Sequence, residues 1–147
     1  MYENYIEELL NSDTVCGPIF KGCVAKNELP NLFNNPSCFI LNTQPRNKNG
    51  EHWLAIYVDN NNHAYFFDSY GMPPKYYNLD TYMIKNSKSY EWNKARIQGK
   101  KPFCGYYCIL FLLYISRNKL RLFFKKFTDN FINNDNFIYN NMIKNLK

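Results

Sequence analysis

The chain is 147 residues long, 46% of them hydrophobic and 18% aromatic, and its formal net charge is +6. A chain of this length forms one domain with a continuous core, and so large an apolar share excludes a disordered tail. The longest apolar run, Cys108 to Ile115, is far shorter than the roughly 20 residues that a membrane-spanning helix needs, so we expect one domain over residues 1–147 and no membrane partner.

The N-terminal part of the chain predicts one helix and one strand. Apolar residues recur at helical spacing over residues 2–10, which predicts a short amphipathic helix at one edge of the core. The Cys16-Gly17-Pro18 segment ends that pattern. The apolar run from Cys38 to Thr43, closed by Gln44-Pro45, predicts a buried strand, and a polar loop up to Gly50 follows it.

A hairpin is predicted between His52 and Asp68. Two runs rich in aromatic and β-branched residues, 52–58 and 64–68, flank an asparagine-rich turn. A three-residue loop centred on Asn60 places His52 directly opposite Asp68, whereas an even-numbered loop breaks that register. Opposed residues share a face with their Cβ atoms about 4.5 to 5.5 Å apart, close enough for a hydrogen bond between imidazole and carboxylate. The hairpin therefore predicts a His52–Asp68 pair.

The second half of the chain predicts a strand over 94–98, a break over 99–102 and then helices. Apolar residues keep helical spacing from Cys104 to Ile115, which predicts one apolar stripe and puts Cys104 in the first turn of a core helix. Two more helices are predicted, over 120–127 and over about 135–146.

Cys104, His52 and Asp68 are the parts of a thiol nucleophile, its base and the carboxylate that orients the base. The N-terminus of a helix favours the thiolate form of a cysteine. Gly105 lets a substrate backbone approach closely, and the backbone amide of Cys104 could donate to an oxyanion. Gln98 is the second oxyanion donor that we expect, because its side-chain amide is neutral.

Each of these residues also has a structural alternative. His52 could be a hydrogen-bonded core residue, Asp68 could start a turn, and Cys104 could pack as a small hydrophobe. For Cys108 we prefer the core interpretation, and we expect His63, at the hairpin turn, to face solvent. A zinc site built on these cysteines and a histidine has no paired CxxC or HxxxH spacing to support it, so we expect no metal.

The cysteines and the positive charge bear on location and partners. The cysteines number five, are irregularly spaced and follow no secretory leader, so a reducing, intracellular location is expected. Cations gather between Arg96 and Lys126, which permits an acidic partner such as DNA. The alternative is a solvated basic surface that keeps the protein soluble. We expect a monomer.

Five motifs occur in an order and spacing that are specific as a set. They are Cys16-Gly-Pro-Ile-Phe-Lys-Gly22, Ile40-Leu-Asn-Thr43 followed by Gly50-Glu-His52-Trp53, Phe66-Phe-Asp68-Ser-Tyr-Gly71, Gln98-Gly99, and Cys104-Gly-Tyr-Tyr-Cys108. This set resembles the adenovirus-type maturation proteases (adenain) and, more distantly, the SUMO-specific proteases. The resemblance implies an α+β fold of papain-like type: a small mixed or antiparallel sheet flanked by helices, with the nucleophile at the N-terminus of a core helix.

The resemblance also implies a role for each site residue. Cys104 attacks a peptide carbonyl, His52 is first base and then acid, and Asp68 orients the imidazole. Gln98 and the Cys104 amide form the oxyanion hole. Trp53 matches a family tryptophan that shapes the site around small substrate residues, with ordinary core packing as its alternative. Family members cut after glycine, so Gly-X-Gly sites in capsid or other viral precursor polypeptides are the expected substrates.

The chain departs from the family in three ways. Asp68 stands where the adenovirus enzyme has glutamate, and no cysteine lies between Asp68 and Gln98. Activation by a disulfide-linked capsid peptide is therefore not expected, whereas a peptide bound in another way, or DNA, is permitted as a cofactor. The tail after Arg117 matches no family motif.

The expected source is a DNA virus or a virus-like element such as a Polinton or virophage, and the expected location is the host nucleus or the virion. Three other functions stay open. They are a protease that removes ubiquitin-like proteins, an acyltransferase that uses the same triad, and a nonenzymatic nucleic-acid-binding module.

Overall fold

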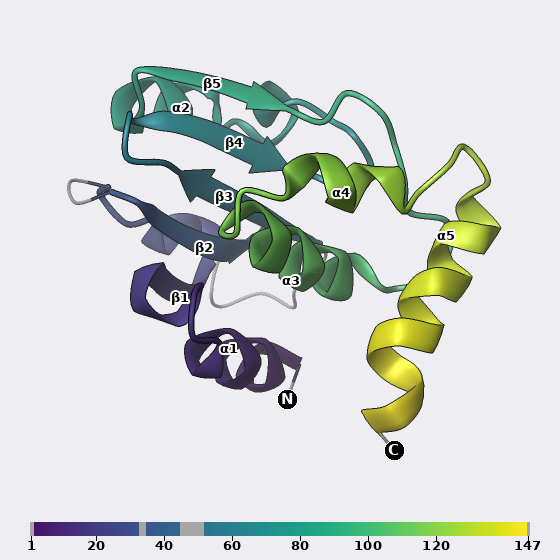
Figure 1. Cartoon of the computed structure of the whole chain (residues 1–147). Coiled ribbons are helices and arrows are strands. Elements are labelled where there is room, and N and C mark those ends of the chain that lie inside the picture. Colours follow the sequence, from purple (N-terminus) through teal and green to yellow (C-terminus); the bar gives the residue numbers. More distant parts are fainter. Residues whose placement is uncertain (1, 33–34, 45–51, 147) are drawn as a thin grey trace.

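A mixed sheet with helices packed against it forms the framework of the molecule (Figure 1). The computed structural model describes residues 2–32, 35–44 and 52–146, so the predicted polar loop up to Gly50 lies outside the described residues. The strands are β1 (Phe20–Ala25), β2 (Ser37–Asn42), β3 (Trp53–Val58), β4 (His63–Phe67) and β5 (Ser89–Trp92). The α-helices are α1 (Tyr2–Ser12), α2 (Asp80–Asn86), α3 (Cys104–Ile115), α4 (Leu120–Lys125) and α5 (Phe131–Ile138).

The five strands lie in the sheet in chain order, β1-β2-β3-β4-β5. The central strands pair antiparallel, β2 with β3 and β3 with β4, while the outer pairs β1–β2 and β4–β5 are parallel. The predicted mixed sheet flanked by helices is therefore confirmed, as are the first helix and the buried strand before the hairpin. Within the described residues, no helix is both long and apolar enough to cross a bilayer.

The three central strands, β2, β3 and β4, are mostly apolar and buried because both faces of the sheet are covered there. Ile40 and Phe67 face one cluster of buried side chains, which also holds residues of α1, α3, α4 and α5. Phe39 and Phe66 face a second cluster, which holds Leu79 and residues of α2. Helix α3 is consequently buried on most of its circumference rather than along the single stripe that its spacing predicts.

The hairpin forms, but the predicted register is wrong by two residues. Val58 pairs with Ala64 and Ile56 with Phe66, so five residues, 59–63, separate the first pair instead of the predicted three, and the last of them, His63, already begins β4. The Asp59 carboxylate explains the longer turn, because its Oδ1 atom accepts hydrogen bonds from the backbone N–H groups of Asn61 and His63 at 2.8 and 3.0 Å. A slip of two residues leaves every side chain on its predicted face.

The predicted strand over 94–98 is wrong, since the last strand is β5, Ser89–Trp92. The chain after β5 turns across the end of β4, where the amides of Ile97 and Gln98 both donate to the Ser69 carbonyl. The break over 99–102 and the helix beginning at Cys104 are confirmed. The last helix begins at Phe131, ahead of the predicted start, because the Asn130 side chain caps it.

Candidate active site

Three separate elements bring His52, Asp68 and Cys104 to one end of the sheet. His52 directly precedes β3, Asp68 directly follows β4, and Cys104 is the first residue of α3. Because β3 and β4 are antiparallel, the start of one and the end of the other lie at the same end of the hairpin (Figure 1). The three residues are 9%, 0% and 9% exposed, in that order, so the group is nearly enclosed.

The contact between His52 and Asp68 is present, with 2.6 Å between Nε2 and Oδ1. It does not arise from direct opposition across the strands, as the predicted register had it. Continued beyond its last pair, the observed register places Tyr70 opposite His52, so Asp68 is a diagonal neighbour. Diagonal positions have Cβ atoms about 7 to 8 Å apart, which two extended side chains can bridge.

His52 also contacts the cysteine on its other side. Burial alone lowers the pKa of the ring, but the hydrogen bonds to Asp68 and Cys104 and the charges of both partners outweigh burial and raise it to about 9. Because Nε2 is engaged by Asp68, Nδ1 is the ring nitrogen left for the thiol. The imidazole therefore holds a proton at neutral pH, between a carboxylate and a sulfur that can each balance its charge.

Asp68 is held by a full set of donors. Its Oδ1 atom accepts from His52 and from the Tyr70 backbone N–H at 2.9 Å. Its Oδ2 atom accepts from the Tyr77 hydroxyl at 2.6 Å and from the Met72 backbone N–H at 3.2 Å. The two backbone contacts are those of a turn, so Asp68 both starts a turn and orients the histidine. The two sequence interpretations of this residue are compatible.

Two further residues secure the pair and were missed from the sequence. The Tyr70 ring stacks on the His52 ring, with centroids 4.6 Å apart and planes 19° apart. The buried Asn93 side chain accepts from the Asp68 backbone N–H at 3.0 Å and donates to the Asp68 carbonyl at 2.5 Å. Tyr70 lies inside the acid motif and could have been considered, whereas an isolated asparagine far along the chain carries no signal.

Gln98 lies in the same region and is fully buried. Its Oε1 atom accepts a short hydrogen bond from the Ser69 hydroxyl, and its Nε2 atom donates to the Lys101 carbonyl at 2.7 Å. A primary amide has two N–H groups, so one remains for another acceptor. The side chain is thus fixed at both ends rather than free to turn.

Of the other residues considered in the sequence, Trp53 and Gly105 adjoin the site in the chain, whereas His63 lies away from it. Trp53 follows His52 and is partly buried, and its carbonyl accepts from the Cys108 thiol at 3.4 Å. Burial raises the pKa of Cys108 well above its ordinary value, in keeping with a core role. Gly105 is the second, buried residue of α3. His63 lies at the far end of β4, where its Nε2 atom is 2.6 Å from Glu91, so it is only partly solvent-facing.

The described residues contain no group of three or more histidine, cysteine, aspartate or glutamate side chains placed to hold a metal ion. The polar atoms of the site are instead engaged with one another, as the contacts of His52, Asp68 and Gln98 illustrate. The arrangement offers a sulfur next to a protonated imidazole, with hydrogen-bond donors nearby. That combination suits nucleophilic attack on a carbonyl carbon.

Removing the Tyr77 hydroxyl should destabilise the fold. In Tyr77→Phe one oxygen of the buried Asp68 carboxylate loses a donor, and hydrogen bonds to charged groups contribute about 1.5 to 3 kcal/mol. Urea unfolding at neutral pH measures the difference. Tyr76→Phe is the matched control, because the neighbouring Tyr76 is 65% exposed. Equal stability of the two variants would contradict a structural role for the Tyr77–Asp68 bond.

Comparison with known proteins gives one informative likeness. No protein-family model matches the chain. The chain is similar to the protein named "Protease" of Bovine adenovirus C serotype 10, with 30% identity over 118 residues that cover 68% of this chain and 59% of that protein. The chain thus spans about three fifths of the length of that relative. This likeness supports the adenovirus-protease resemblance that the motifs around His52, Asp68 and Cys104 carry.

Proposed function

We propose that the protein is a cysteine endopeptidase of the adenovirus-protease type, with a papain-like fold in which the nucleophile begins the core helix. The observation that carries this proposal is the position of His52, hydrogen-bonded to Asp68 on one side and to Cys104 on the other. A buried imidazole between a carboxylate and a thiol at a helix start is the arrangement that a cysteine nucleophile needs. The similarity to an adenovirus protein named Protease supports the same activity.

The reaction begins with the thiol proton on His52, whose raised pKa of about 9 keeps the ring protonated at neutral pH. The Cys104 sulfur attacks the peptide carbonyl carbon, so an S–C bond forms and the carbonyl electrons move to oxygen. His52 gives its proton to the departing amine as the C–N bond breaks, which leaves a thioester. Water that loses a proton to His52 hydrolyses the thioester and restores the pair.

Two donors stabilise the oxyanion. The first is the backbone N–H of Cys104, because the first N–H groups of a helix have no partner within the helix. The second is the N–H of Gln98 that is not used by the Lys101 carbonyl. Ser69 and Lys101 hold the two ends of the Gln98 amide, so this donor needs no reorganisation when charge develops on the substrate oxygen.

The substrates that we propose are viral precursor polypeptides with small residues before the scissile bond, such as Gly-X-Gly. Trp53 stands next to His52, where the family has a tryptophan that shapes the site around small residues, and Gly105 follows the nucleophile. The similarity to a viral protein favours a DNA virus as the source and the host nucleus or virion as the location. It lends no support to the Polinton or virophage alternative.

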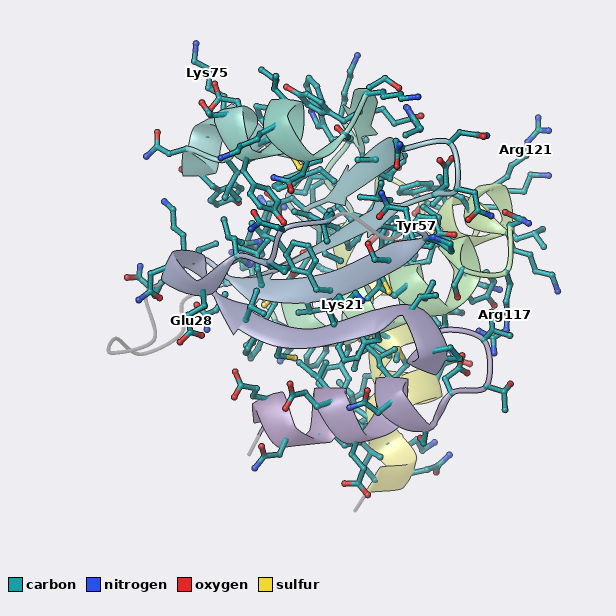
Figure 2. The ribbon with its side chains drawn as sticks, turned by 90° about the vertical axis from the view of Figure 1, so that its left-hand side faces the viewer. Lys21, Glu28, Tyr57, Lys75, Arg117 and Arg121 are labelled. Atoms are coloured by element: carbon teal, nitrogen blue, oxygen red, sulfur yellow. The ribbon has the colours of Figure 1, made fainter. Side chains whose placement is uncertain are left out.

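DNA is a second partner that we propose, on the basis of exposed cations. Lys119, Arg121 and Lys125 on and beside α4 are all exposed, and Figure 2 shows the Arg121 side chain extending away from the ribbon. Binding to a polyanion through such residues weakens with rising salt. A nonenzymatic nucleic-acid-binding module is the competing interpretation of the same surface.

Cleavage of a peptide library by the purified monomeric protein, with and without duplex DNA, tests the function. We expect cuts after glycine, preferentially in Gly-X-Gly, and faster cleavage when DNA is present at low salt than at high salt. A ubiquitin-like fusion ending in Gly-Gly, offered in parallel, separates precursor processing from deconjugation. No cleavage in any arm, together with salt-sensitive DNA binding, would contradict the protease and favour the binding module.

A further inference from the structure

The C-terminal helix α5 makes direct contact with the segment that joins Gln98 to the nucleophile helix. The Asp135 carboxylate is 4% exposed, and its Oδ1 atom accepts from the Gly99 backbone N–H at 3.0 Å. Its Oδ2 atom accepts from the Lys101 backbone N–H at 3.2 Å. One carboxylate therefore holds two backbone groups of the segment 98–103, which leads directly into Cys104.

The fit between α5 and this segment is close. A Cβ atom added to Gly99 would lie 2.5 Å from Asp135 Oδ2 and 3.0 Å from the Phe131 carbonyl oxygen. Such separations are too short for any side chain larger than glycine unless the segment moves away from the helix. One residue earlier on α5, the buried Asn134 amide donates to the Ile97 carbonyl at 2.8 Å. Helix α5 thus forms hydrogen bonds with the backbone of both neighbours of Gln98, Ile97 and Gly99.

The contact with Asp135 extends to the Gln98 side chain through a single residue, Lys101. Lys101 donates its N–H to Asp135 and accepts, at its carbonyl, the hydrogen bond from Gln98 Nε2 at 2.7 Å. The orientation of the Gln98 amide therefore depends on where Lys101 is held. Asp135 is the side chain that fixes the Lys101 N–H from outside the segment.

Arg96 ties the same segment to the histidine. Its Nε atom donates to the Gln98 carbonyl at 2.6 Å and its guanidinium lies 5.0 Å from the Tyr70 ring centroid and 5.1 Å from that of Phe131. Tyr70 in turn stacks on His52. Helix α5, the Gln98 segment and the histidine are thus in continuous contact.

We propose that Asp135 is a positioning residue of the active site: by holding Gly99 and Lys101 it fixes the Gln98 oxyanion donor against the start of α3. The inference rests on the proposed function of the site. It gives the tail after Arg117, which matches no family motif, a role in the reaction. In this role Asp135 acts through the backbone of Gly99 and Lys101 that it holds.

The test compares Asp135→Ala and Asp135→Asn with the wild-type chain, using steady-state cleavage of a Gly-X-Gly peptide and the alkylation rate of Cys104 by iodoacetamide. Alkylation requires the thiolate but no oxyanion donor, whereas turnover requires both. For Asp135→Ala we expect kcat to fall by about 10- to 100-fold, toward the cost of losing an oxyanion donor. KM and the alkylation rate should stay within about twofold of wild type, because an oxyanion donor acts on the transition state and not on substrate binding or on the thiolate.

Asp135→Asn keeps one acceptor but turns an NH₂ group toward the Lys101 N–H, so we expect a smaller fall in kcat. Tyr107→Phe is the matched control, since the Tyr107 hydroxyl donates to the same carboxylate at 2.7 Å and its removal leaves the bonds from Gly99 and Lys101 to Asp135 in place. This control should lose stability and retain kcat. If Asp135→Ala does not fold, Gly99→Ala is the second variant. Its added methyl group would meet Asp135 and push the segment away from α5, so it should reproduce the kcat loss.

Three outcomes overturn the proposal. The first is wild-type kcat in folded Asp135→Ala, and the second is a parallel fall of kcat and alkylation, which indicates general disorder of the site. The third is an equal loss of kcat in Tyr107→Phe. A wild-type protein that cleaves no peptide overturns the proposed function as well, so failure of the two proposals is distinguishable.

Discussion

Replacing Cys104 with alanine should abolish peptide cleavage while leaving the fold intact. In the proposed mechanism the sulfur is the atom that bonds to the substrate carbonyl, and loss of a nucleophile of this kind lowers kcat by about four orders of magnitude or more. The cost to the fold should be small, because alanine keeps the helix-forming backbone of α3 and Cys104 is not in its most buried part. Fluorogenic peptide assays and thermal unfolding measure the two effects.

Cys108→Ala is the matched control for this variant. Cys108 lies one turn later on the same helix, is fully buried and donates to the Trp53 carbonyl. Its loss should lower the melting temperature and leave kcat per folded molecule within a few-fold of wild type. Retained cleavage in Cys104→Ala would contradict Cys104 as the nucleophile. Abolished cleavage in folded Cys108→Ala would indicate that Cys108 takes part in the reaction.

Limited alkylation at neutral pH gives the same answer without mutation. None of the five cysteines forms a disulfide, and Cys104, at 9% exposure, is the least buried of them. Cys16 and Cys38 are fully buried, with their sulfur atoms 3.6 Å apart. Iodoacetamide followed by peptide mass spectrometry should therefore find Cys104 modified first. Equal modification rates of all five in the folded protein would count against a catalytic thiol.

The parts of the site that could be predicted are those set by local periodicity. The 3.6-residue spacing after Cys104 fixed it at a helix start, and the alternation of two strands put His52 and Asp68 on one face. The two residues share a face although the predicted register was wrong by two residues, because a shift of two residues keeps each side chain on the same face of the sheet. The error itself arose from the side chain of Asp59, whose bonds to the Asn61 and His63 amides stabilise a five-residue connection between Val58 and Ala64.

The parts that could not be predicted depend on segments far apart in the chain. Asn93 clamps the backbone of Asp68 across 25 residues, and Asp135 holds Gly99 across 36. Neither residue belongs to a motif, and a lone asparagine or aspartate reads locally as a turn or cap residue. The prediction of a strand over 94–98 was wrong for the same reason, since the amides of Ile97 and Gln98 bond to the Ser69 carbonyl rather than to a strand.

Replacing Asp68 with asparagine should lower kcat far more than it changes KM. Asparagine has nearly the same shape but no charge, so the imidazolium loses stabilisation and the preferred orientation of the ring weakens. By analogy with other triads we expect a loss of about two to four orders of magnitude in kcat. Peptide hydrolysis across a range of substrate concentrations separates the two constants.

The pH dependence of the same variant supplies an independent check. In the wild-type protein the pKa of His52 is raised to about 9 by Asp68 and Cys104 against the opposing effect of burial. Activity should therefore persist to about pH 9 and fall above it, as the ring loses the proton that the leaving amine needs. Without the carboxylate, burial has greater weight and lowers this pKa, so the alkaline limb of the Asp68→Asn profile should move to lower pH.

The free energy of unfolding should also fall as the pH rises and His52 loses its proton. Because the folded-state pKa of His52, about 9, lies above the ordinary value of about 6.5, protonation of the ring stabilises the fold fully below pH 6.5, and this contribution is lost as the pH rises through 9. The difference in the free energy of unfolding between wild type and Asp68→Asn, measured by urea unfolding, should thus decrease as the pH rises from about 6.5 to about 9. If both kcat and the alkaline limb are unchanged in Asp68→Asn, the catalytic role of Asp68 is contradicted. Its role is then the structural one of forming a turn through its bonds to the Tyr70 and Met72 amides.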